Sequence, residues 1–285
     1  MKSELLEKLL FALPDIRKNH ALGTEFYSFL KMTARKEVED LFSGTDENPR
    51  ELKPFGELIF PYHEMGAIDS LNLFDIDELI IFSFYWINRN RYRRVADIGA
   101  NIGLHSIILS KCGYEVCSYE PDPKHFEVLE RNLKMNKCFN VQPFCAAVSS
   151  KAGEMKFVRV LGNLTASHLV GSKANPYGEL EKFPVKVEAI GPIMEWADLI
   201  KLDAEGHEKE ILLATNEKHW LNTDALIEVE NENNASLIYE HLKTIGVKLF
   251  SQKTNWQPVK DISGMPTSYR EGTLFATSRS ETPWA

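Results

Sequence analysis

The apolar positions in the first part of the chain recur every three or four residues. This period is typical of amphipathic helices, and it predicts helices over residues 4–13 and 24–42. Pro14 would end the first of them, because proline cannot continue a helix. A short strand is expected over residues 56–62. A further helix begins after Asp75, whose carboxylate is suited to cap its first turn.

From Arg94 onward, short apolar runs alternate with helical segments. The expected strands cover residues 95–97, 115–119, 141–148, 199–203, 225–229, 247–250 and 273–276. The expected helices begin at Leu104, Pro123, Glu208 and Ala235. Such alternation predicts an α/β fold with a mostly parallel, Rossmann-like sheet that carries helices on both faces. No long helix separates the last two strands, so we expect them to form an antiparallel edge.

The change of pattern divides the chain into two parts. Residues 1–55 are predicted to form a helical N-terminal extension, and residues 56–285 the main α/β domain. The extension could cap the core, cover a substrate or form the face of a homodimer. The pattern alone does not choose among these roles.

Composition narrows the class of protein. With 33 basic and 41 acidic residues the net charge is −8, which argues against a nucleic-acid partner, because phosphate-backbone binding needs a concentrated basic surface. The basic run Arg89–Arg94 is interpreted as a solvated helix end.

The sequence shows no secretion signal and no apolar stretch long enough for a bilayer, so we expect a cytoplasmic protein without a membrane partner. The four cysteines lack zinc-site spacing and are predicted to be free thiols.

A glycine turn, Asp97-Ile98-Gly99-Ala100-Asn101-Ile102-Gly103, follows the strand over residues 95–97 and leads into a helix. Glycine allows a sharp turn and the close approach of a ligand to the backbone. The turn could be purely structural, or it could bind a dinucleotide or S-adenosylmethionine (SAM). The dinucleotide fingerprint G-x-G-x-x-G is absent, because no third glycine follows Gly103. SAM carries an ammonium and a sulfonium, so a carboxylate such as Asp97 is electrostatically favourable beside it.

An acidic residue, Glu120, closes the second strand, one βαβ unit after the glycine turn. A carboxylate at that place can accept both hydroxyls of a ribose in a bidentate contact. The combination of turn and carboxylate favours a nucleoside-containing cofactor, and SAM in particular.

At these residues the chain resembles the FkbM-type SAM-dependent methyltransferases. The resemblance rests on residues 95–106, 119–123 with Leu129 and Asn132, 146–149 and 200–208. It covers roughly residues 76–250, so the first helices lie outside it. It implies a class I methyltransferase sheet and methyl transfer, usually to an oxygen of a sugar or other small natural product.

The resemblance also implies roles for individual residues. The expected contacts to the methionine part of SAM are Asp97, Gly99, Ala100, Asn101 and Gly103. Glu120, with Pro121 beside it, would hold the ribose. Cys145 and Ala146 would border the adenine. At position 207 this chain has a histidine, where relatives tend to have a small or apolar residue. This difference bears on the identity of the substrate more than on SAM binding.

The acidic segment 203–208 follows an apolar strand, so Asp203 is expected to face the ligand crevice. Methyl transfer to a hydroxyl needs alignment and help with removal of the proton. Asp203, Glu205 and His207 are therefore the candidate catalytic residues. Alternatively, Glu205 and Glu208 only stabilise the start of a helix, and His207 only lies on the surface. His105 and His168 are weaker candidates.

A divalent metal is conceivable at this segment, and Glu228 and Glu230 could add oxygen ligands. No tight ligand motif is visible, so no metal site is predicted.

The leading hypothesis is a small-molecule O-methyltransferase. An N-methyltransferase acting on a protein or nucleic acid is the alternative within the same fold. Asn175-Pro176-Tyr177 resembles an amine-acceptor motif, but it lies before the Asp203 strand and is discounted. A non-catalytic SAM-binding module and a nicotinamide oxidoreductase are the other classes considered.

Overall fold

The computed structural model describes residues 1–66, 68–161, 167–169, 179–280 and 284. The helices are α1 (Glu4–Ala12), α2 (Glu25–Phe42), α3 (Ile76–Ile87), α4 (Leu104–Lys111), α5 (Pro123–Met135), α6 (Ile190–Trp196), α7 (Glu208–Leu212) and α8 (Glu232–Thr244). The first strands are β1 (Arg50–Glu51), β2 (Glu57–Leu58), β3 (Arg94–Ile98), β4 (Glu115–Tyr119), β5 (Val141–Phe144), β6 (Ala147–Ser149) and β7 (Gly153–Leu161). The later strands are β8 (His168–Leu169), β9 (Glu179–Ala189), β10 (Leu199–Leu202), β11 (Asp224–Ile227), β12 (Lys248–Ser251), β13 (Gln257–Pro258) and β14 (Leu274–Thr277).

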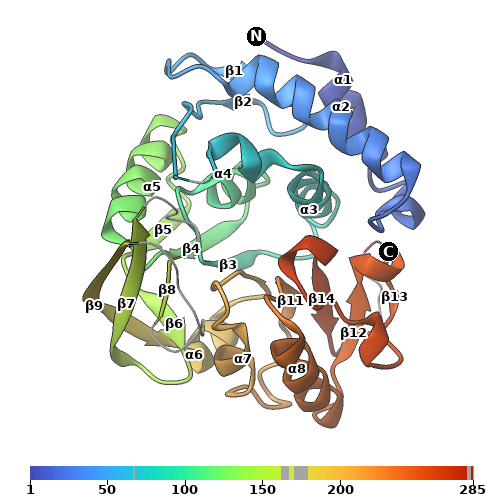
Figure 1. The fold of residues 1–285 in the computed structure, drawn as a ribbon, viewed down its shortest axis with the longest axis vertical. Coiled ribbons are helices and arrows are strands. Elements are labelled where there is room, and N and C mark those ends of the chain that lie inside the picture. Colours follow the sequence, from blue (N-terminus) through green and yellow to red (C-terminus); the bar gives the residue numbers. More distant parts are fainter. Residues whose placement is uncertain (67, 162–166, 170–178, 281–283, 285) are drawn as a thin grey trace.

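The central sheet has eight strands in the order β13-β12-β14-β11-β10-β3-β4-β5. Within this sheet, the neighbouring strands β11, β10, β3, β4 and β5 run parallel to one another. β14 pairs antiparallel with both β11 and β12. The predicted architecture is confirmed: a Rossmann-like, mostly parallel sheet with helices on both faces and an antiparallel edge (Figure 1). After β5 the chain returns to β10 on the opposite side of β3. The carboxyl ends of β3 and β10 therefore flank a switch in strand order, where α/β proteins bind ligands.

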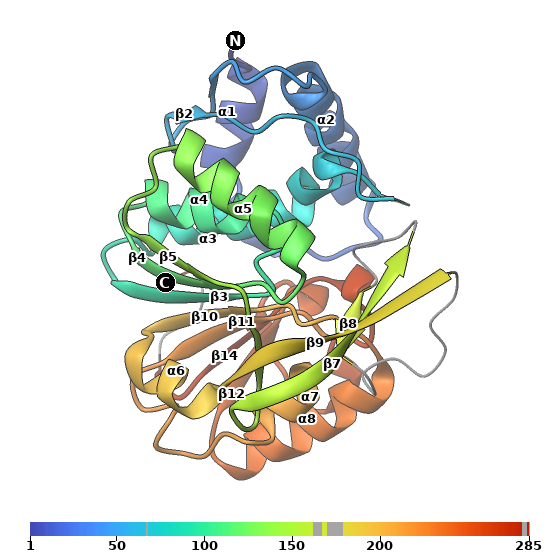
Figure 2. The same ribbon diagram turned by 90° about the vertical axis from the view of Figure 1, so that its left-hand side faces the viewer.

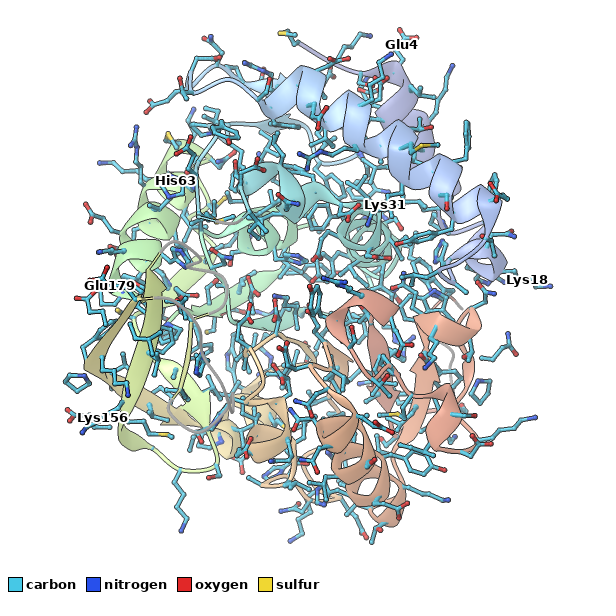
Figure 3. The ribbon with its side chains drawn as sticks, in the orientation of Figure 1. Glu4, Lys18, Lys31, His63, Lys156 and Glu179 are labelled. Carbon is cyan, nitrogen blue, oxygen red and sulfur yellow. The ribbon has the colours of Figure 1, made fainter. Side chains whose placement is uncertain are left out.

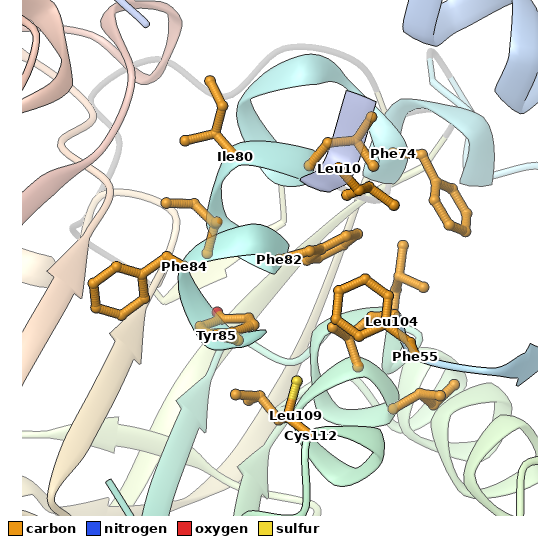
Figure 4. Close-up of a cluster of buried hydrophobic side chains, with 14 of the residues drawn as sticks. Leu10, Phe55, Phe74, Ile80, Phe82, Phe84, Tyr85, Leu104, Leu109 and Cys112 are labelled. Atoms are coloured by element: carbon orange, nitrogen blue, oxygen red, sulfur yellow. The ribbon is translucent and has the colours of Figure 1, made fainter. Parts of the chain in front are cut away.

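Helices cover both faces of this sheet. α3, α4 and α5 lie on one face, and α6, α7 and α8 on the other (Figure 2). Each face buries its own apolar cluster, one around Phe82, Tyr85 and Leu104 (Figure 4) and one around Ile200 and Ile227. Because parallel strands are buried on both faces, their sequences read as continuous apolar runs.

Polar caps fix where the helices begin. The Asp75 carboxylate accepts a hydrogen bond from the Ile76 N–H at 2.8 Å, as its expected role as N-cap requires. Asp122 caps α5, where Pro123 occupies the first position. Asn231 caps α8 by accepting from the Asn234 N–H, so this helix begins at Glu232, three residues before the expected Ala235.

A second sheet, in the order β6-β9-β7-β8, stands beside the main one. The prediction of a single strand over residues 141–148 is wrong. The chain breaks at Cys145 and Ala146, so that β5 ends the main sheet and β6 pairs with β9 in the second. The long β7–β9 hairpin, paired from Gly153 opposite Val187 to Leu161 opposite Glu179, was not expected.

The N-terminal helices pack on the α3 side of the main sheet (Figures 1 and 2). Their apolar faces, including Leu6, Leu10, Leu30 and Val38, join the same buried cluster as α3 and α4. Charged residues such as Glu4 and Lys18 point outward at the periphery (Figure 3). The strand expected over residues 56–62 is reduced to Glu57–Leu58.

Candidate functional site

The main cavity opens at the carboxyl ends of β3, β4 and β10. It holds about 630 Å³ of space, counted with its open mouth. Of the predicted site residues, seven line it: Gly99, Asn101, Glu120, Pro121, Ala146, Asp203 and Glu205. The structure thus brings together the glycine turn, the ribose candidate and the acidic segment.

The glycine turn is held by its own backbone and by the neighbouring strand. Gly99 has φ +80°, and a Cβ added to it would lie only 1.7 Å from the Asp203 carbonyl oxygen. Asn101 also has a positive φ of 51°, and Gly103 takes the left-handed conformation as N-cap of α4. Only glycine tolerates both the conformation and the contact at position 99.

Several predicted contacts lie just behind the cavity wall. Asp97 is fully buried, and its Oδ2 accepts a hydrogen bond from the Ser106 hydroxyl at 2.6 Å. Ala100 is buried beneath the turn, and Gly103 packs against Leu129. Cys145 is exposed and lies outside the lining. These four predicted residues therefore shape the turn or its surroundings rather than the cavity surface.

Glu120 fixes the turn from below and also lines the cavity. Its two carboxylate oxygens accept hydrogen bonds from the backbone N–H groups of Asn101 and Asp122, each at 2.8 Å. Burial raises the pKa of Glu120 to about 8. The same carboxylate keeps lone pairs for hydroxyl donors from a ligand.

A buried ion pair connects the second sheet to this site. Arg159 on β7 donates two hydrogen bonds to Asp122, at 2.6 and 2.8 Å, and both side chains are buried. Burial opposes ionisation of Asp122, but the hydrogen bonds from Arg159 hold its pKa below the usual value. The sequence pattern missed this pair, because β7 itself was not predicted.

His125, in the first turn of α5, is a further lining residue that the sequence did not single out. It is 4% exposed, and no described residue bonds its Nε2. Burial lowers the pKa of His125 to about 4, so the imidazole is neutral. Phe157 from β7 and Ser167 and His168 beside β8 complete that wall.

The acidic segment forms a tight turn after β10. Lys201 Nζ lies 3.2 Å from Asp203 Oδ2 and 3.4 Å from the Gly99 carbonyl oxygen, so it ties the acidic turn to the glycine turn. Glu208 Oε1 accepts hydrogen bonds from the N–H groups of Ala204 and Gly206. Burial raises the pKa of Glu208 to about 7. Glu208 therefore holds the turn, while Asp203 and Glu205 face the cavity.

His207 lies outside the cavity. It is 5% exposed, and its Nε2 lies 2.8 Å from the Ser149 hydroxyl. Burial lowers the pKa of His207. The alternative of a surface position is wrong, and the buried position separates this ring from the residues that line the cavity.

Among the residues that the structure describes, no three His, Cys, Asp or Glu side chains lie together in an arrangement that could hold a metal ion. Within the same residues, no helix combines the length and the apolar character needed to cross a bilayer. The motif Asn175-Pro176-Tyr177 lies outside the described residues.

Comparison with known proteins identifies the family of the chain. The family described as "Methyltransferase FkbM domain" matches residues 97–246, from the glycine turn to the end of α8. The chain belongs to the FkbM methyltransferase family. It is accordingly a SAM-dependent methyltransferase, and the expected resemblance is confirmed. The match leaves out α1 and α2, as expected, but it begins at residue 97 and so also leaves out α3, which the expected extent from residue 76 included.

Individual relatives are methyltransferases of low identity. Methyltransferase sdnD from Sordaria araneosa is 26% identical over 62% of this chain and 81% of its own length. Hexuronic acid methyltransferase AglP from Haloferax volcanii is 28% identical over 41% of this chain, and the match spans only 47% of AglP. An O-methyltransferase from Bacillus cereus, solved in complex with SAH, aligns with 70% of this chain and 80% of its own at 12% identity and a TM-score of 0.39.

Proposed function

We propose that this FkbM-family enzyme transfers the methyl group of SAM to a hydroxyl of a sugar or another small polyhydroxylated acceptor. The observation that carries the proposal is one cavity, at the switch in strand order, lined by Gly99, Glu120 and Asp203. A hexuronic acid methyltransferase among the relatives supports a sugar as the acceptor. The N-methyltransferase alternative has less support, because the motif that resembles an amine-acceptor site, Asn175-Pro176-Tyr177, precedes the Asp203 strand instead of following it.

The residues at the cavity fit SAM. The side-chain oxygen Oδ1 of Asn101 and the Nε2 of His125 are buried at the cavity without a described partner, so both can bond a ligand. The Glu120 carboxyl offers an acceptor for the ribose hydroxyls, and Gly99 leaves the turn free of a side chain. The turn lacks the third glycine of a dinucleotide site, and the Asp203 carboxylate would repel a pyrophosphate.

Bound SAM would supply an electrophilic methyl group on a sulfonium. The chain contributes orientation, desolvation and proton removal. We propose that Asp203 accepts the proton of the attacking hydroxyl, with Lys201 fixing the position of its carboxylate. Glu205, on the same turn, is the second candidate for this role. His207 is left out, because its imidazole faces Ser149.

Two substitutions separate cofactor binding from chemistry. Glu120→Ala is expected to weaken SAM binding at least about tenfold in calorimetry, because the ribose hydroxyls lose their carboxyl acceptor. Asp203→Asn is expected to bind SAM normally but to lower kcat by about 10²–10⁴-fold, the usual contribution of a general base. Unchanged SAM affinity in Glu120→Ala would remove the proposed cofactor site.

We further expect methyl transfer to persist after exhaustive chelation of divalent metals. Activity that is lost on chelation and restored by magnesium would contradict this expectation.

A further inference from the structure

A second cavity lies beside the first, at the carboxyl ends of β10 and β11. It holds about 440 Å³, counted with its opening. Its polar lining comes from distant parts of the chain: Glu78 on α3, His105 on α4, Lys201 on β10, Glu228 after β11 and Tyr269 near the C-terminus. The matched family region alone does not build it, since α3 lies outside residues 97–246.

The Lys201–Asp203 ion pair forms the shared wall of the two cavities. Lys201 lines the second cavity, and the Asp203 carboxylate that it contacts lines the first. The Glu228 N–H donates to the Leu202 carbonyl at 2.9 Å, which sets Glu228 level with Asp203 on the neighbouring strand. A ligand in the second cavity would therefore lie next to the proposed base.

The hydrogen-bonding groups in this cavity are only partly used. Glu78 Oε2 lies 2.9 Å from His105 Nε2, and the other ring nitrogen lies 3.0 Å from the Tyr85 hydroxyl. Lys201 acts on the Glu228 carboxyl through its charge, and none of the hydrogen bonds among the described residues ends on that carboxyl. Lys201 uses two of its three N–H groups, on Asp203 and Gly99. Acceptors and one donor thus remain for a ligand.

The lining of this cavity offers no free cation to an anionic ligand. Both basic groups of the lining are already paired, Lys201 with Asp203 and His105 with Glu78. Glu228 adds an unpaired carboxyl, and burial together with the Asp203 charge raises its pKa well above the usual value. Arg270, whose guanidinium lies 5.4 Å from the Tyr269 ring centroid, is exposed at the rim and not part of the lining.

We propose that this second cavity is the acceptor site and that it selects an uncharged sugar ring, bound through neighbouring hydroxyls, over a ring that carries a carboxylate or phosphate. The inference rests on the proposed function. A carboxyl such as Glu228 can bond two adjacent hydroxyls at once, whereas an anionic substituent would find no free cation in the lining.

Matched sugars test the charge selection. The wild-type enzyme with SAM is offered glucose, galactose and mannose, each beside its uronate and its 6-phosphate, and SAH release and the mass of the product are measured. At least one uncharged ring is expected to be methylated, with kcat/KM about 100-fold or more above its anionic partners. Preference for an anionic ring, or no transfer to any uncharged ring by an enzyme that binds SAM, overturns the proposal. Absence of SAM binding in calorimetry would instead contradict the proposed function.

Variants of the lining test the location. Glu228→Gln is expected to raise KM about tenfold or more with kcat changed less, and to leave SAM affinity unchanged. Glu228→Lys is expected to shift the preference toward the uronate partner. Glu240→Gln, the same change at an exposed position of α8, serves as the control. If both Glu228 variants fold, bind SAM and keep wild-type KM and preference, the acceptor does not bind in this cavity.

Discussion

Gly99 is required for a reason that the sequence shows only in part. The glycine pattern suggested that a ligand approaches the backbone here. The structure adds a protein neighbour, because the Asp203 carbonyl oxygen fills the place where a Cβ would stand. The two turns that carry the proposed cofactor and base residues are thus in direct contact, and a side chain at position 99 would push them apart.

Gly99→Ala is expected to lose measurable SAM binding and to lower the free energy of unfolding by more than the strain of a left-handed alanine, which is about 1–2 kcal/mol. Calorimetry and urea unfolding check both effects. Gly113→Ala is the matched control, since Gly113 has φ +90° but no atom within 4 Å of the added Cβ. If Gly99→Ala and Gly113→Ala lose the same free energy of unfolding, the contact with the Asp203 carbonyl does not contribute to the requirement for glycine at position 99.

Glu120 should make the stability of the free enzyme fall as the pH rises. Its pKa is raised to about 8 by burial, so the folded state keeps a proton that the unfolded state has released above about pH 4.5. The stabilisation is complete below that value and is lost as the pH approaches 8. The slope is about 1.4 kcal/mol per pH unit for one proton, or on the order of 3 kcal/mol from pH 5 to pH 8.

Glu120→Gln removes this titration. We expect the variant to gain stability relative to wild type between pH 5 and pH 8, measured by urea unfolding at both values, although it binds SAM more weakly. Comparing the two proteins cancels the other titrating groups. If the free energies of unfolding of the wild type and of Glu120→Gln change equally between pH 5 and pH 8, Glu120 is ionised in the free enzyme.

At the scale of elements, the central sheet could be predicted and the second sheet could not. The parallel strands are buried on both faces, so their apolar runs are visible in the sequence. In β9 most residues are exposed or half-buried, and charged positions interrupt its alternation, which leaves little to distinguish it from a loop. The break at Cys145 also escaped prediction, since the apolar run continues unchanged from β5 into β6. Asp203 was placed correctly in the crevice because it directly follows a buried strand.

The pair Arg159–Asp122 attaches the unpredicted hairpin to the cofactor cavity. Arg159→Met leaves the buried Asp122 carboxylate without its partner and is expected to cost about 3–5 kcal/mol and to weaken SAM binding. Adding Asp122→Asn, which keeps the helix cap, should recover at least half of the lost stability. A double-mutant cycle by urea unfolding measures the coupling. If the losses in the free energy of unfolding of the two single variants add up to that of the double variant, the two side chains act independently.

At the scale of the molecule, the N-terminal helices and the methyltransferase sheet share one apolar cluster. Ala34 and Val38 of α2 are fully buried in the same cluster as Phe82 of α3 and Leu104 of α4. The Tyr27 hydroxyl on α2 also donates to Asp77, which lines the second cavity. The extension, outside the family match, is thus connected by packing and by a hydrogen bond to the proposed acceptor site.

This shared cluster predicts one cooperative unit. SAH at 100 times its Kd should stabilise the fold by about 2.7 kcal/mol, which slows exchange through global unfolding about 100-fold. Because α2 cannot keep its buried face when the α3 layer unfolds, peptides over Ala34–Val38 should be protected by the same factor as peptides over β11. Hydrogen–deuterium exchange followed by mass spectrometry compares the two directly. Protection confined to β11, or a protease product that lacks residues 1–55 and still binds SAH, would show instead that the extension folds and unfolds by itself.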